Sequence, residues 1–120
     1  MAFHETLPPR LVELVRQAKD QILARPELFN MYHYAAPTEC GTALCIAGHM
    51  AVLDDPSIYR LPVQVQLRVM MAWRLEHIYG PGLGDEFGRL FYAQEWPHEF
   101  CPMTAECAAA RIDYWLETGK

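Results

Sequence analysis

The longest apolar stretch of the chain is Ala43-Leu-Cys-Ile-Ala-Gly-His-Met-Ala-Val-Leu53, and only Gly48 and His49 interrupt it. A helix that is apolar nearly all round is typical of the centre of a protein. Glycine in mid-helix costs up to about 1 kcal/mol relative to alanine, and close approach of another helix or of a ligand is the usual compensation. We therefore expect a buried central helix over residues 43–53, with Thr42 as its N-cap.

Helical spacing of apolar residues recurs on both sides of this stretch. The first helix is expected over residues 7–24, and the others cover about residues 62–79, 85–92 and 104–119, with Thr104 capping the last and Gly119 closing it. The apolar face of the helix over residues 62–79 is expected to contain Val63, Leu67, Met70, Met71, Leu75 and Ile78. The pattern predicts an all-α fold, a compact single-domain bundle of about five helices spanning residues 1–120.

Composition and charge exclude several classes of protein. The chain has 120 residues, of which 52% are hydrophobic and 21% charged, as in an ordinary globular domain. Its net charge is −5, and ten Lys and Arg are scattered among fifteen acids, so we expect no nucleic acid as a partner. The apolar stretch is too short to span a bilayer, and the N-terminus lacks the features of a secretion signal. We expect a cytoplasmic protein of a bacterium or phage, with no membrane contact and with its four cysteines reduced.

One segment could carry chemistry, Cys40-Gly-Thr-Ala-Leu-Cys-Ile-Ala-Gly-His49. In a first interpretation it is a metal site, in which Cys40, Cys45 and His49 bind zinc. The fourth ligand would come from His33, or from His98 or Cys101 farther along the chain. The spacing is not that of a familiar zinc knuckle, and the chain contains no Cys-x-x-Cys pair.

In a second interpretation the segment holds a cysteine nucleophile. With Thr42 as the cap, Cys45 lies in the first helical turn, where the helix dipole favours a thiolate, and His49 lies one turn on. Alternatively, Cys40 is activated by a histidine from elsewhere in the chain. Two side chains at i and i+4 on one helix leave little room for a substrate between them.

In a third interpretation the segment is structural. Buried cysteines often behave as small apolar side chains, and His49 would be a core histidine held by a hydrogen bond. A helix packed tightly at the centre of a bundle accounts for Gly48 as well.

The segment resembles the core of a family of small uncharacterised bacterial and phage proteins with the pattern CGTxxCxAG. Asn30-Met31 and the later Leu90-Phe91 and Trp96-Pro97 pairs match further positions of that family. The resemblance implies that the segment matters but supplies no reaction. We therefore expect a non-enzymatic binding or accessory protein that acts through protein–protein contacts, with a protein partner or self-association, and keep the metal protein and the cysteine enzyme as alternatives.

Overall fold

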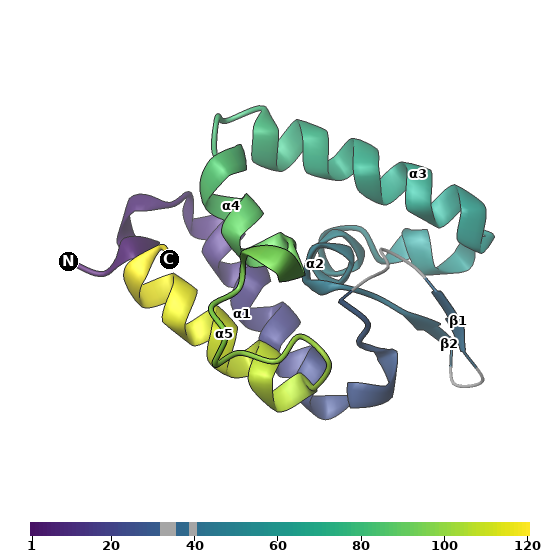
Figure 1. Ribbon diagram of the computed structural model, residues 1–120. Coiled ribbons are helices and arrows are strands. Elements are labelled where there is room, and N and C mark those ends of the chain that lie inside the picture. Colours follow the sequence, from purple (N-terminus) through teal and green to yellow (C-terminus); the bar gives the residue numbers. More distant parts are fainter. Residues whose placement is uncertain (32–35, 39–40) are drawn as a thin grey trace.

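The computed structural model describes residues 1–31, 36–38 and 41–120, and the predicted all-α class is confirmed. Five α-helices are joined by 3₁₀ and π turns (Figure 1). The α-helices are α1 (Pro9–Ala24), α2 (Ile46–Asp54), α3 (Val63–Arg74), α4 (Gly84–Phe91) and α5 (Ala105–Thr118). The shorter turns are η1 (Phe3–Thr6), η2 (Pro26–Leu28), η3 (Pro56–Arg60), η4 (Leu75–Tyr79) and η5 (Ala93–Glu95).

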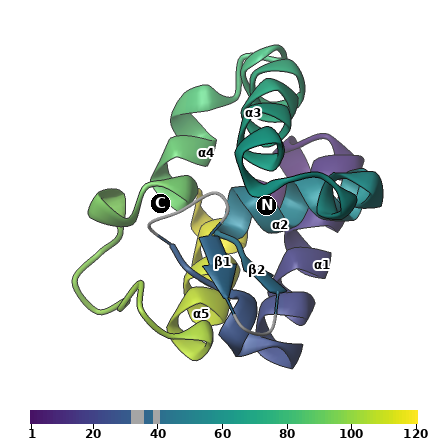
Figure 2. The ribbon, with the colours of Figure 1, turned by 90° about the vertical axis from the view of Figure 1, so that its right-hand side faces the viewer.

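The expected buried central helix is α2. It runs between α3 on one side and the α1–α5 pair on the other, and the views in Figures 1 and 2 agree on this order of layers. Every residue of α2 from Ile46 to Val52 is buried. Because α2 has no solvent-facing stripe, its apolar residues contact helices on both sides of it.

The N-terminal boundary of α2 differs from the prediction. Residues Gly41–Ala43 form a short strand, β2, which pairs antiparallel with β1 (Ala36–Thr38), so Thr42 does not cap the helix. The backbone of Leu44 then hydrogen-bonds Leu28 and Asn30 at 2.7 and 3.0 Å. These bonds keep the chain extended through Cys45, and α2 begins only at Ile46.

Helix α3 continues beyond Arg74 into the π-helical turn η4, where Gly80 N–H donates to the carbonyl of Leu75 at 3.0 Å. Its inner face contains Gln66, Met70 and Trp73. The apolar face expected for this helix is therefore only partly correct, because Met70 and Ile78 are buried whereas Leu67, Met71 and Leu75 are exposed. In Figures 1 and 2 α3 lies at the edge of the molecule, above α2.

The two ends of the described chain meet, and the predicted role of Gly119 as the end of the last helix is confirmed. Gly119 has φ +72°, and a Cβ atom there would lie 2.7 Å from Cδ2 of Phe3. The ring of Phe3 packs edge-on against Trp115, with 5.2 Å between the ring centroids. Thr104 also caps α5 as expected, accepting a hydrogen bond from Cys107 N–H at 3.2 Å.

We predict that Gly119→Ala lowers the free energy of unfolding by roughly 2–3 kcal/mol, because left-handed backbone strain adds to the overlap with Phe3. Gly82→Ala is the matched control, since Gly82 has φ +81° but no atom within 4 Å of the added methyl group. That variant should lose only about 1 kcal/mol. Urea unfolding monitored by circular dichroism measures the free energy of unfolding of both variants. Equal losses would show that Phe3 moves aside without cost and that the overlap with it does not destabilise the fold.

Candidate functional site

Cys45 occupies the N-cap of α2, not the first turn. Its Sγ accepts a hydrogen bond from Gly48 N–H at 3.4 Å, and the side chain is buried. Burial raises the pKa of the Cys45 thiol from 9.0 to about 11. The expectation that the helix terminus favours a thiolate here is therefore wrong, because loss of hydration outweighs the backbone hydrogen bonds.

His49 is fully buried, and protein groups engage both of its ring nitrogens. Nδ1 lies 2.8 Å from Oε1 of Gln21, and Nε2 lies 3.0 Å from the backbone oxygen of Leu28. Burial lowers the pKa of His49 from 6.5 to about 4, so the imidazole is neutral at pH 7. A neutral ring donates from one nitrogen only, so with Nε2–H donating to Leu28 the amide of Gln21 must turn its NH₂ group toward Nδ1.

The set of metal ligands expected from the sequence is described only in part. Cys40 and His33 lie outside the described residues, so the zinc site formed by Cys40, Cys45, His49 and His33 stays a prediction. Within the described ranges, no three side chains of the types that bind metals gather at one point. The contacts of Cys45 and His49 support the structural interpretation of this segment.

Sequence reasoning missed a second feature, an exposed apolar face on α3. Its side chains are Leu67, Met71, Leu75 and Tyr79, which we call the α3 outer face. Leu75 is 62% exposed and Met71 is 48% exposed. Single exposed apolar residues are ordinary, but contiguous ones mark interaction surfaces.

An aromatic and cationic cluster ends this face. The guanidinium of Arg74 hydrogen-bonds the hydroxyl groups of Tyr79 and Tyr92, whose oxygens are 3.1 Å apart. Its Cζ atom lies 5.1 and 5.0 Å from the centroids of the two rings. The ring of Tyr79 packs against Gly84, where any Cβ atom would overlap it. The cluster thus joins η4 to the C-terminal end of α4.

Two cavities lie beside this cluster. The smaller, of about 210 Å³, is lined by Met71, Arg74, Leu75, Tyr79 and Tyr92. The larger, of about 380 Å³, shares the two tyrosines and adds polar side chains of α4, including Asp85 and Arg89. The smaller cavity is therefore apolar with one cation, and the larger one carries charges of both signs.

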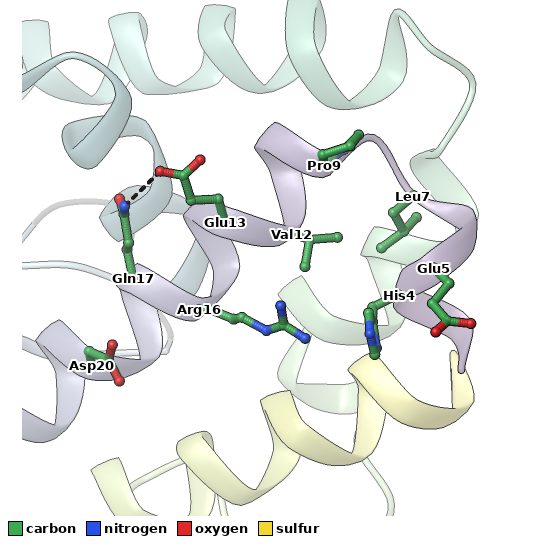
Figure 3. A pocket seen from close by; sticks show the side chains of 9 residues that line it. All are labelled: His4, Glu5, Leu7, Pro9, Val12, Glu13, Arg16, Gln17 and Asp20. Carbon is green, nitrogen blue, oxygen red and sulfur yellow. Dashed lines mark hydrogen bonds between the residues drawn. The ribbon is translucent and has the colours of Figure 1, made fainter. Parts of the chain in front are cut away.

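A further groove of about 390 Å³ lies along η1 and the outer side of α1 (Figure 3). Leu7 and Val12 form its apolar part, and the side chain of Arg16 extends toward His4. Glu13 lies elsewhere in the lining and accepts a hydrogen bond from Gln17 at 3.0 Å. The mixed charges of this open groove favour no particular class of ligand.

No family model, curated protein or solved structure matches the chain. The resemblance to proteins with the CGTxxCxAG pattern therefore stays a prediction. Among the described helices, none has both the length and the apolar character needed to cross a lipid bilayer.

Proposed function

We propose that this protein is a non-enzymatic binding protein that contacts a different protein through the α3 outer face and the adjoining Arg74–Tyr79–Tyr92 cluster. The observation that carries the proposal is the composition of this surface. It combines Met71, two tyrosines and an arginine, which are residue types enriched at protein interfaces, and it adds the exposed apolar side chain of Leu75. We also propose a cytoplasmic location, which fits the free thiols of Cys45, Cys101 and Cys107.

Charge favours an unlike partner over a second copy of the chain. If two α3 helices paired antiparallel about Met71, residues equally far before and after the centre would face each other. Leu67 would then meet Leu75, but Arg68 would meet Arg74. Like charges at an interface disfavour the pairing, so the surface suits another protein better than itself.

We predict that Leu75→Asp removes binding of the natural partner while leaving the fold intact, because a buried carboxylate at the interface would lose its hydration. Full-length protein carrying a tag is compared with Leu75→Asp and with Leu23→Asp in extracts of the native host. Leu23 is an exposed apolar residue on α1 and provides the matched control. We expect a protein from the extract to bind to the tagged parent and to Leu23→Asp but not to Leu75→Asp.

The retained protein must then bind purified parent protein directly, with at least about tenfold weaker affinity for Leu75→Asp. Sedimentation of the purified chain alone tests self-association. If the purified chain forms a dimer and Leu75→Asp dissociates it, the partner of the α3 outer face is a second copy of this chain and not a different protein. If all three forms retain the same proteins and sediment alike, the α3 outer face is not the binding surface.

A further inference from the structure

The shape of the α3 outer face indicates what kind of segment it receives. Leu67, Met71 and Leu75 are spaced at i, i+4 and i+8, so they form one row about 12 Å long on the helix surface. Rows of side chains four residues apart are the ridges that fit into the grooves of a second helix. A β-strand would instead need an exposed strand edge with free backbone groups, which α3 does not offer.

The cavity at the end of this row has the size of a single side chain. Its volume of about 210 Å³ lies below the roughly 300–1,000 Å³ typical of sites for small molecules. Met71, Leu75 and the two tyrosine rings give it apolar walls. It therefore suits one large apolar side chain of a partner better than a separate cofactor or metabolite.

Two arginines and one acid lie directly beside the row, whereas the acids Asp85 and Glu95 line the larger cavity beyond the two tyrosines. Arg68 is exposed, directly follows Leu67 and has no partner among the described residues. Arg74 lines the cavity itself. Glu76 is the exposed acid on the same helix, and it points about 100° round the helix from Leu75. A partner with carboxylates flanking its apolar side chains would complement this face on a chain that is acidic elsewhere.

We infer that the α3 outer face binds an acidic amphipathic α-helix of another protein. The apolar side of that helix lies along Leu67, Met71 and Leu75, and its carboxylates face Arg68. One of its side chains enters the smaller cavity, which Met71, Leu75 and the two tyrosine rings line. This inference rests on the proposed function, and it adds the structure and the charge of the bound segment.

The test uses three synthetic peptides of about 18 residues, long enough to form a helix. One is an amphipathic helix with leucines flanked by glutamates, the second has lysines in place of the glutamates, and the third is the acidic peptide in scrambled order. Fluorescence anisotropy with labelled peptides measures binding to the full chain. The inference expects the first peptide to bind, and the other two to bind at least about tenfold more weakly.

Two variants locate the site. Leu75→Asp should weaken binding of the acidic peptide by at least about tenfold, and Leu23→Asp should leave it unchanged. Arg68→Glu should weaken the acidic peptide and strengthen the basic one, a reversal that loss of structure would not produce. Equal binding of the three peptides, or no change with Arg68→Glu, would overturn the inference.

The two proposals can fail separately. If no peptide binds but the natural partner still depends on Leu75, the proposed function stands and the acidic helix is wrong. If the acidic peptide binds and Leu75→Asp has no effect on it, the helix binds elsewhere and the assigned surface is wrong.

Discussion

Replacement of His49 by alanine is expected to lower the free energy of unfolding by about 3–5 kcal/mol. The substitution empties a fully buried site and removes the bonds of His49 to the Gln21 amide and the Leu28 carbonyl, although this carbonyl keeps its bond from Leu44 N–H. Truncation of a large buried side chain to alanine costs about 2–5 kcal/mol, and a lost hydrogen bond adds about 1 kcal/mol. His49→Gln is the control, because its amide N–H can reach the position of Nε2 and keep the bond to Leu28. It should lose less than half as much, as measured by urea unfolding at pH 7.

The same residue gives stability a dependence on pH. The pKa of His49 is about 4 in the folded chain against 6.5 in the unfolded chain, so the unfolded chain binds the proton first as the pH falls. The contribution is fully present above pH 6.5 and is lost progressively as the pH falls toward 4, by up to roughly 3 kcal/mol. The stability difference between the parent and His49→Gln should therefore shrink over this range. A difference that does not change with pH would contradict the buried neutral imidazole.

A structural metal at this segment predicts a different outcome. A metal ion that binds only the folded chain stabilises it, so a chelator would destabilise the parent but not the His49 variants, which lack a ligand. With both imidazole nitrogens held by Gln21 and Leu28, we expect the thermal midpoint of the parent to be unchanged by a chelator.

The sequence predicted the helices and the central position of α2 because both follow from periodic burial. It could not predict where α2 begins. Thr42 is a good cap by residue type, but pairing of Gly41–Ala43 with Ala36–Thr38 takes it into a strand. Pairings between segments are set by the folded chain rather than by local preference. The thiol of Cys45 was misjudged for the same reason, since its pKa depends on burial that a single helix does not reveal.

The α3 outer face could not be predicted from the sequence because apolar residues are abundant in that helix. Met70 and Met71 are adjacent and chemically identical, yet one is buried and the other is 48% exposed. With apolar side chains on several sides, helical spacing alone does not say which side faces α2. The contact between Tyr79 and Gly84 also depends on the conformation of the turn between η4 and α4. The spacing of apolar residues does not predict that conformation.

Trp115→Ala is expected to be the other most damaging substitution, with a loss of about 3–5 kcal/mol in the free energy of unfolding. Trp115 is fully buried and connects three elements. Its ring packs on Phe3 of η1 and on Phe87 of α4, with 4.8 Å between the Phe87 and Trp115 centroids. Its Nε1–H donates to the backbone oxygen of Glu86 at 2.9 Å. Truncation therefore opens a large cavity and removes the hydrogen bond that ties α5 to the start of α4.

Trp115→Phe separates these two effects. The phenylalanine ring preserves most of the contacts with Phe3 and Phe87 but provides no donor for Glu86, so the expected loss is about 1–3 kcal/mol. Because Phe3 also touches Gly119, the double variant Trp115→Ala with Gly119→Ala should lose less than the sum of the single losses. Once Trp115 is gone, Phe3 can move into the vacant space and the overlap at residue 119 is relieved. Strictly additive losses would show that Phe3 does not transmit strain between the two ends of the chain.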